Sequence, residues 1–180
     1  VAIQQVYSRN GQRYRDLYYR LHAEVDAPID RVRRAVTAGS AEAVLVRTSD
    51  HGDLLGAHGG LHQKWFNLYD EATRVPFTIV RVGRSSTGSR VVDAPTSHVD
   101  LVPTLLGAAD VDVEAVAESL RESFSEVHPL PGRNLMPVVD GGDADDHRAV
   151  YLMTRDNILE GDSGASGLGR QLKQTSNPPA

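Results

Sequence analysis

The sequence predicts an α/β fold with a mixed, largely parallel sheet flanked by helices, of which this chain holds an incomplete part. Three features lead to this prediction: a long helical periodicity, a short and nearly continuous apolar run at residues 43–46, and a polar loop directly after that run. A continuous apolar run is typical of a strand buried on both faces, as in a parallel sheet. The polar loop then lies at the carboxyl end of a strand, where open α/β sheets bind ligands.

The bulk composition narrows the functional class. The chain has 180 residues, 40% hydrophobic and 24% charged, which is ordinary for one globular domain with a substantial core. Its net charge of −5 and its scattered Lys and Arg residues argue against a nucleic-acid partner. It contains no cysteine, which excludes disulfides, thiolate zinc sites and cysteine nucleophiles within these residues. No apolar run reaches the roughly 20 residues that span a bilayer, so no membrane span is expected.

Residues 14–38 are predicted to form one long amphipathic helix. Its apolar residues recur every three or four positions, and they are Leu17, Leu21, Val25, Ile29, Val32 and Val36. We expect this face to be buried and Gly39 to end the helix. Pro28 lies inside the run and is expected to kink it.

Shorter elements are predicted along the rest of the chain. The predicted helices are residues 67–73, 97–107 and 111–124, the predicted strands are 75–80 and 149–153, and 83–90 is a predicted hairpin turn. Ser97 is the expected cap of the second of these helices, and Pro103 lies in its first turns. Residues 127–146 are rich in Pro, Gly and Asp and are predicted to form a loop.

The loop after the first strand, Thr48-Ser49-Asp50-His51-Gly52-Asp53, carries a candidate metal site. The carboxylate of Asp50 favours hard cations such as Ca²⁺ or Mg²⁺, and the imidazole of His51 widens the choice to Mn²⁺ or Zn²⁺. Both side chains can converge on one ion where the backbone is irregular, and Gly52 permits this. The alternative is that Asp50 is a cap or turn residue and His51 an ordinary loop histidine, because two ligands alone do not make a site.

Two more candidates follow in the chain. Lys64 could bind an oxyanion as a point charge or protonate a leaving oxygen; the alternative is a solvated surface lysine. His58 and His62 are spaced four apart, but Gly59 and Gly60 make a helix between them improbable, so a helical two-histidine zinc motif is not supported.

Five blocks of the sequence, taken in their order along the chain, form a recognisable pattern. They are Tyr18-Tyr19 with Val25-Asp26 and Ile29, Thr48-Ser49-Asp50-His51-Gly52-Asp53-Leu54-Leu55-Gly56-Ala57-His58-Gly59, Tyr69-Asp70-Glu71-Ala72-Thr73-Arg74-Val75-Pro76-Phe77, Ser97-His98-Val99-Asp100-Leu101-Val102-Pro103-Thr104-Leu105-Leu106 and Gly132-Arg133-Asn134-Leu135-Met136. In this order the blocks resemble the sulfatases of the alkaline-phosphatase superfamily. The Ser-Asp-His-Gly block with a following lysine is the most specific of them.

The resemblance implies an arylsulfatase-like hydrolase that acts on a small-molecule sulfate ester. It implies one divalent cation bound by Asp50 and His51, with Ca²⁺ the expected ion and Mg²⁺ or Mn²⁺ the alternatives. It also implies that Lys64 contacts the sulfate and the leaving oxygen and that His62 adds substrate contacts. Relative to the family's spacing, Gly59-Gly60 inserts one residue before Lys64.

The sequence departs from the family at the nucleophile. Sulfatases attack sulfur with a formylglycine made from the Cys or Ser of a Cys/Ser-x-Pro-x-Arg motif. Cysteine is absent here, and Ser176-Asn177-Pro178-Pro179-Ala180, the nearest match, lacks the Arg. Since position 1 is also not Met, we expect the chain to be a fragment of a longer sulfatase and to be inactive alone.

The resemblance also gives an expected domain organisation. Residues 1–126 are expected to be the C-terminal part of the sulfatase catalytic domain, 127–148 a loop or boundary, and 149–180 the start of a further segment with a mobile tail. Two alternatives stay open. One is a phosphonate monoester or phosphodiester hydrolase of the same superfamily, whose Asp-His-Gly loop is similar. The other is a noncatalytic interaction or structural protein built on this fold.

Overall fold

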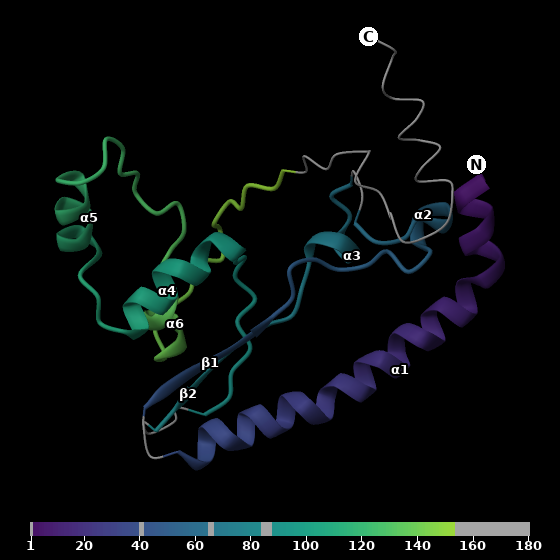
Figure 1. Ribbon diagram of the computed structural model, residues 1–180, viewed down its shortest axis with the longest axis horizontal. Coiled ribbons are helices and arrows are strands. Elements are labelled where there is room, and N and C mark those ends of the chain that lie inside the picture. Colours follow the sequence, from purple (N-terminus) through teal and green to yellow (C-terminus); the bar gives the residue numbers. More distant parts are fainter. Residues whose placement is uncertain (1, 40–41, 65–66, 84–87, 154–180) are drawn as a thin grey trace, which may run out of the picture. The chain divides into compact units, whose positions relative to one another are not determined.

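A computed structural model describes residues 2–39, 42–64, 67–83 and 88–153 (Figure 1). Its elements are α1 (Ala2–Ala38), β1 (Ala43–Thr48), α2 (Ala57–Gly60), α3 (Asp70–Thr73), β2 (Phe77–Val82), the short 3₁₀ helix η1 (His98–Asp100), α4 (Leu101–Ala108), α5 (Val113–Arg121) and α6 (Met136–Val139). They belong to two compact units. The loop unit contains the described parts of residues 1–19, 49–75 and 152–180, and the sheet unit contains those of 20–48 and 76–151.

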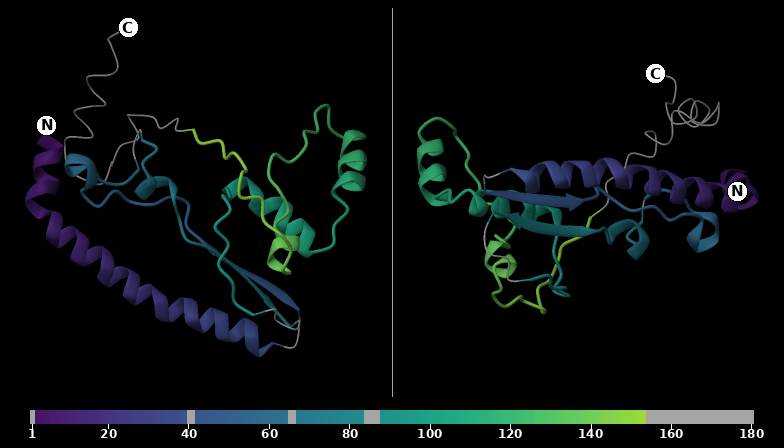
Figure 2. Two further views of the ribbon diagram at one scale, coloured as in Figure 1. Left: turned by 180° about the vertical axis from the view of Figure 1, so that it is seen from behind. Right: turned by 90° about the horizontal axis from the view of Figure 1, so that it is seen from below.

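The described strands, β1 and β2, form an antiparallel pair that Figure 2 shows from two sides. Ala43 lies opposite Val82 and Thr48 opposite Phe77. The prediction of a strand after the long helix is confirmed, but a largely parallel sheet is not confirmed by the described residues. The apolar run that favoured a parallel sheet is only half-buried at residues 43–46, and β2 alternates inward and outward positions, as one-sided antiparallel pairs do.

The long helix is confirmed, and it runs unbroken from Ala2 to Ala38 through Pro28. The expected burial of its apolar face is wrong for the described residues. Four of the residues on that face remain between 42% and 56% exposed, and they are Leu17, Leu21, Val25 and Val32. A helical periodicity marks a face that can be buried, but burial also needs a partner surface. Neither α1 nor any other helix in the described ranges is long and apolar enough to cross a membrane.

The shorter elements follow the predictions unevenly. The predicted helices appear as α3, as η1 with α4, and as α5, with ends that differ by a few residues. Helix α6 lies in the segment predicted as a loop, and residues 149–153 form no strand. Residues 84–87 of the predicted turn at 83–90 and the expected tail after residue 153 lie outside the described residues.

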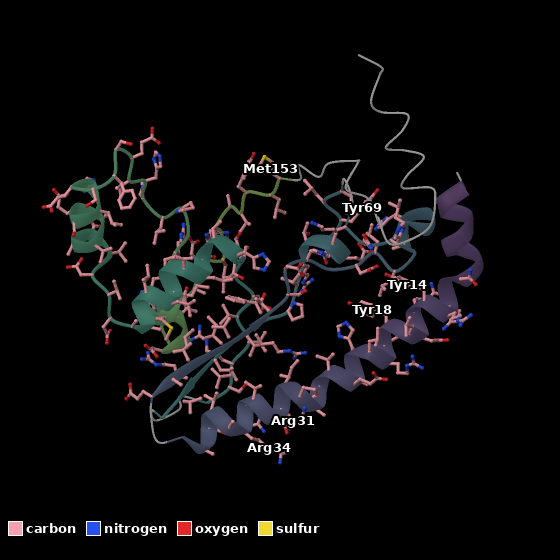
Figure 3. All side chains as sticks on the ribbon, in the orientation of Figure 1. Tyr14, Tyr18, Arg31, Arg34, Tyr69 and Met153 are labelled. Carbon is pink, nitrogen blue, oxygen red and sulfur yellow. The ribbon has the colours of Figure 1, made fainter. Side chains whose placement is uncertain are left out.

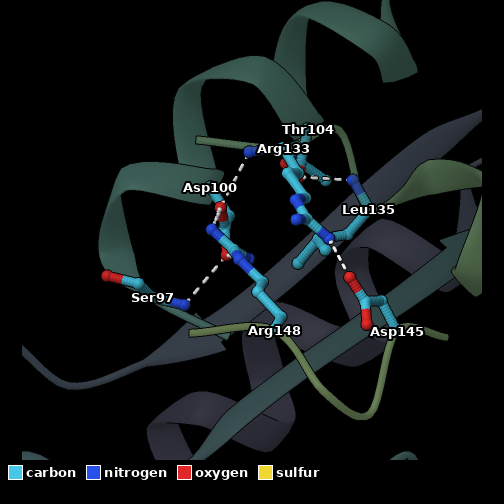
Figure 4. A network of polar contacts seen from close by, with 7 residues as sticks. All are labelled: Ser97, Asp100, Thr104, Arg133, Leu135, Asp145 and Arg148. Atoms are coloured by element: carbon cyan, nitrogen blue, oxygen red, sulfur yellow. Dashed lines mark hydrogen bonds and ion pairs between the residues drawn. The ribbon is translucent and has the colours of Figure 1, made fainter. Parts of the chain in front are cut away.

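A buried carboxylate organises the sheet unit, as Figure 4 shows. Asp100 has no exposed surface, and Arg148 donates to both of its oxygens at 2.6 and 2.7 Å. The backbone N–H of Ser97 donates to Oδ2 at 2.9 Å, and that of Arg133 to Oδ1 at 2.8 Å. Burial alone raises the pKa of Asp100. The hydrogen bonds from Arg148 and the two amides together lower it by more, so the net pKa is below the usual value. Asp100 therefore joins η1 to two segments more than thirty residues further along the chain.

Thr104 extends this network on α4. Its hydroxyl donates to the carbonyl of Arg133 at 3.3 Å and accepts from the N–H of Leu135 at 3.0 Å. At Gly132 a Cβ atom would lie 1.9 Å from the carbonyl oxygen of Val99, so only glycine allows this close approach. These contacts hold the segments 97–106 and 132–136 against each other.

Candidate active site

The candidate metal ligands lie in the loop unit, directly after β1. The hydroxyl of Ser49 donates to the carbonyl of His51 at 2.7 Å, and the N–H of His51 donates to Oδ1 of Asp50 at 2.9 Å. This bond from the His51 amide is the main cause that holds the pKa of Asp50 below its usual value. Asp50 is therefore a turn residue, as the alternative interpretation proposed, but the turn occupies Oδ1 and not Oδ2.

The other oxygen of Asp50 faces the imidazole of His51. Oδ2 lies 3.5 Å from Nε2, and the side chains of Asp50 and His51 are 85% and 37% exposed. Nδ1 of His51 lies 2.8 Å from the carbonyl oxygen of Gly52, which can accept a hydrogen bond from a protonated Nδ1. That tautomer leaves Nε2 as the nitrogen that can bind a cation.

The donor chemistry of this pair fits a divalent cation, but two ligands alone do not make a site. One ionised carboxylate oxygen and one imidazole nitrogen suit the cations that the sequence predicts. Over the described ranges, no group of three or more His, Cys, Asp or Glu side chains is arranged to hold a metal ion. His62 therefore does not join Asp50 and His51 as a third ligand.

Gly52 fixes the base of the loop against α3. Its N–H donates to the carbonyl of Ala72 at 2.9 Å, and a Cβ atom on it would lie 1.9 Å from the carbonyl oxygen of Glu71. The sequence predicted that Gly52 provides conformational freedom. The structure gives a different reason for glycine, which is the close approach of two backbones.

The chain then makes a closed lobe, residues 53–63, and returns to its starting point. The N–H of Leu54 donates to the carbonyl of Gln63 at 3.0 Å, and the N–H of Gly56 donates to the carbonyl of Leu61 at 2.7 Å. Leu54 is 2% exposed and forms the apolar centre of the lobe. The lobe thus brings Gln63, the residue before Lys64, back to Asp53 and Leu54 at its start.

The two histidines of the lobe have different environments. His58 adopts a positive φ of 51°, stacks on Tyr69 with ring centroids 3.6 Å apart, and lies 3.1 Å from Glu71 through Nε2. His62 is only 9% exposed. Helix α2 contains His58, ends before His62 and has non-helical residues at His58 and Gly59, so the expectation that no regular helix joins the two histidines is confirmed.

Lys64 follows the lobe in a turn and is half-buried. Gln63, its neighbour, has a positive φ of 55° and is bonded to the start of the lobe through both its N–H and its carbonyl. Gly59 and Gly60, where the sequence predicts one added residue, lie inside the lobe, and both have positive φ. The lobe closes before Lys64 with both glycines inside it.

Asp53 is the residue of this loop that sequence reasoning missed. Oδ1 accepts from the N–H of Leu55 at 2.8 Å and from the N–H of Gln63 at 3.2 Å, and Oδ2 accepts from the hydroxyl of Tyr14 at 2.7 Å. Asp residues often accept a hydrogen bond from the backbone N–H two residues ahead and so form a turn, and the sequence alone could have indicated this role for Asp53. It could not have indicated the contact with Tyr14, which lies 39 positions earlier.

A separate cavity lies in the sheet unit. It has a volume of about 330 Å³ and is bounded by α4, α5 and residues 128–134. Its polar lining includes Glu114, Arg121 and His128, and none of the predicted site residues contributes to it. The cavity is thus distinct from the loop that carries Asp50 and Lys64.

Comparison with known proteins agrees with the family that the blocks resemble. A family model described as Sulfatase matches residues 2–111, more than half of the chain. The chain is 36% identical to the uncharacterized sulfatase YidJ of Escherichia coli (strain K12) over 131 residues, which are 72% of this chain and 23% of that protein. It is 32% identical to the choline-sulfatase of Rhizobium meliloti (strain 1021) over 143 residues, 76% of this chain and 24% of that protein.

A third relative is the N-acetylglucosamine-6-O-sulfatase of Bacteroides thetaiotaomicron (strain ATCC 29148), with 29% identity over 111 residues, 60% of this chain and 17% of that protein. The chain thus spans about a quarter or less of the length of these relatives. No solved structure matched it. On the match of the family model to more than half of its residues, the chain belongs to the sulfatase family.

Proposed function

We propose that this chain is part of the catalytic domain of a sulfuric ester hydrolase, an arylsulfatase-like enzyme, and that it supplies part of the metal and sulfate site. The observation that carries the proposal is the 3.5 Å approach of Asp50 Oδ2 to His51 Nε2, on a loop that closes just before Lys64. Two relatives are named for small sulfate esters, choline sulfate and a sulfated N-acetylglucosamine, and this supports a small sulfate ester as substrate.

Asp50 and His51 are proposed to bind one divalent cation, with Ca²⁺ expected and Mg²⁺ or Mn²⁺ as alternatives. The low pKa of Asp50 supports this role, because the carboxylate is ionised throughout the neutral range. When bound, such a cation supplies positive charge against the sulfate oxygens. The remaining ligands are proposed to come from residues of the sulfatase domain other than the described ones.

Lys64 is proposed as the catalytic residue of this chain. Its ammonium group would bind a sulfate oxygen and neutralise the charge that develops on the leaving oxygen, or donate a proton to it. His62 is proposed to line the sulfate pocket beside it. The attacking group is proposed to be the formylglycine of the family, whose Cys/Ser-x-Pro-x-Arg motif this sequence does not contain.

The proposal is tested with an intact sulfatase domain that contains this chain. Its rates are measured on an aryl sulfate, on an alkyl sulfate and on an aryl phosphodiester, for the unmodified protein and for Lys64→Ala. The expected result is a strong preference for the sulfate in the unmodified protein and, in Lys64→Ala, a fall in kcat of about 100-fold or more on an alkyl sulfate, whose leaving oxygen most needs its charge neutralised. Arg74→Ala removes an exposed cation of the same unit, which is 81% exposed, and should leave the rate unchanged.

Two results would contradict the proposal in different ways. A preference for the phosphodiester would identify a phosphonate monoester or phosphodiester hydrolase instead. No turnover of either ester by the cation-loaded intact domain would support a noncatalytic protein.

A further inference from the structure

Asp53 lies at the neck of the lobe of residues 53–63, where the chain enters the lobe and where it leaves it. Its Oδ1 accepts N–H bonds from both sides of this neck, from Leu55 on the outgoing segment at 2.8 Å and from Gln63 on the returning segment at 3.2 Å. The carboxylate therefore ties together two segments that are ten residues apart in the sequence. The backbone bond from Leu54 to Gln63, at 3.0 Å, lies beside it.

The two segments that meet at this neck carry the two halves of the proposed site. Asp50 and His51 precede Asp53 by three and two residues, and Lys64 directly follows Gln63. The bond from the Gln63 amide to Asp53 thus constrains the position of Lys64 relative to the metal pair. A lysine side chain is long and flexible, so the place where its backbone is held limits which oxygen the ammonium group can reach.

The other oxygen of Asp53 is held from α1. The hydroxyl of Tyr14 donates to Oδ2 at 2.7 Å, and Tyr14 and Tyr18 extend from the same side of the helix, as Figure 3 shows. Partial burial, followed by the negative charge of Asp53, raises the pKa of the Tyr18 hydroxyl. Asp53 therefore has hydrogen-bond partners on three segments, and the bond from Tyr14 orients it from outside the lobe.

We infer that Asp53 is a positioning residue that holds Lys64 in register with Asp50 and His51. This inference rests on the proposed function, because it gives Asp53 a role only through Lys64. It assigns Asp53 no contact with the substrate and no cation ligand. Removal of its carboxylate should displace Lys64 by opening the neck, while Asp50 and His51 keep their own turn bonds.

The experiment uses the intact sulfatase domain and compares two substrates, an alkyl sulfate and nitrophenyl sulfate. The alkoxide is a poor leaving group and depends on charge neutralisation by Lys64, whereas nitrophenolate leaves readily without it. In Asp53→Ala, kcat/KM is expected to fall about 100-fold on the alkyl sulfate and less than about tenfold on nitrophenyl sulfate. A loss of folded protein would lower both rates by the same factor, so the ratio of the two reports on Lys64 and not on stability.

Three further variants complete the test. Asp53→Asn keeps an oxygen that can accept both amides and should restore most of the alkyl sulfate rate. Asp16→Ala, which removes an exposed carboxylate on α1, should change neither rate. Asp53→Ala in a Lys64→Ala background should add little to the loss on the alkyl sulfate, because the two residues act as one unit.

The outcomes separate this inference from the proposed function. If Lys64→Ala itself lowers both rates equally, the proposed role of Lys64 is wrong, and the inference fails with it. If Lys64→Ala shows the dependence on the leaving group but Asp53→Ala does not, only the positioning role is overturned. Equal losses in Asp53→Ala and Asp53→Asn would also overturn it.

Discussion

The hydroxyl of Tyr14 donates a 2.7 Å hydrogen bond to Oδ2 of Asp53 and so joins α1 to the lobe before Lys64. Tyr14→Phe removes this donor and leaves the aromatic ring in place. We expect the free energy of unfolding to fall by about 1 kcal/mol, since the hydrogen bond to the carboxyl group is partly buried. Urea denaturation measures this change. Tyr19→Phe is the matched control, because Tyr19 is 63% exposed, and an equal effect of both variants would contradict a specific role for the bond.

Asp100 and Arg148 should dominate the stability of the sheet unit. In Asp100→Ala the guanidinium of Arg148, which is 9% exposed, loses both carboxylate oxygens, and the amides of Ser97 and Arg133 lose their acceptor. The free energy of unfolding should fall by about 3 kcal/mol, as when one partner of a buried ion pair is removed. In the control Glu118→Ala, the lost ion pair is exposed, and the expected change is below about 0.5 kcal/mol. Similar unfolding midpoints for the two variants would show that the buried network contributes little.

The same network predicts sensitivity to acid. The pKa values of Asp100 and Asp145 are both lowered in the folded protein; the bonds from Arg148 and two amides outweigh burial at Asp100, and Arg133 is the main cause at Asp145. Their contribution to stability is therefore complete above the unfolded pKa of about 3.9 and is lost as the pH falls through the lower folded values. The urea midpoint should stay nearly constant from about pH 7 to 5 and fall below about pH 4.

Asp100→Asn gives the control for this pH dependence. The variant lacks one of the two titrating groups, so its midpoint should fall less steeply with acid than that of the unmodified protein. A variant whose midpoint follows the same curve would exclude Asp100 as a source of the acid sensitivity.

Local signals in the sequence predicted much of the fold. The three-to-four spacing of apolar residues predicted α1, and the Ser97 cap predicted the helix at η1 and α4, where a capping box is found. Properties that depend on a partner were not predictable in this way. Such properties are decided by the surface that packs against an element, and a local sequence pattern does not contain that information. Examples are the burial of the α1 face, the antiparallel pairing of β1 and the absence of a strand at 149–153.

The candidate site shows the same division. Asp50 and His51 could be singled out from the sequence as adjacent polar residues after a predicted strand, but the reason for glycine at position 52, its close approach to α3, could not. The stacking of His58 on Tyr69 and the bond from Tyr14 to Asp53 join residues 11 and 39 positions apart, so only the folded chain shows them. Asp53 was the residue that the turn chemistry could have indicated, since its carboxylate accepts the amide of Leu55.

The 180 residues by themselves are predicted to show no sulfatase turnover. They include Lys64 and half of the proposed metal site, but no cysteine and no Ser-x-Pro-x-Arg sequence from which the family's nucleophile could form. The test is an assay of the purified chain on nitrophenyl sulfate with and without added Ca²⁺. Turnover that depends on the cation and follows the chain through purification would contradict this prediction.

The most direct test of the central claim is the cation content of an intact sulfatase domain that carries Asp50→Ala. The account predicts that bound Ca²⁺, measured by elemental analysis after dialysis, and turnover of an aryl sulfate are both largely lost. The control Asp146→Ala removes an exposed carboxylate of the sheet unit and should keep both. If Asp50→Ala retains full cation content and an unchanged rate, Asp50 does not bind the cation, and the proposed site is wrong.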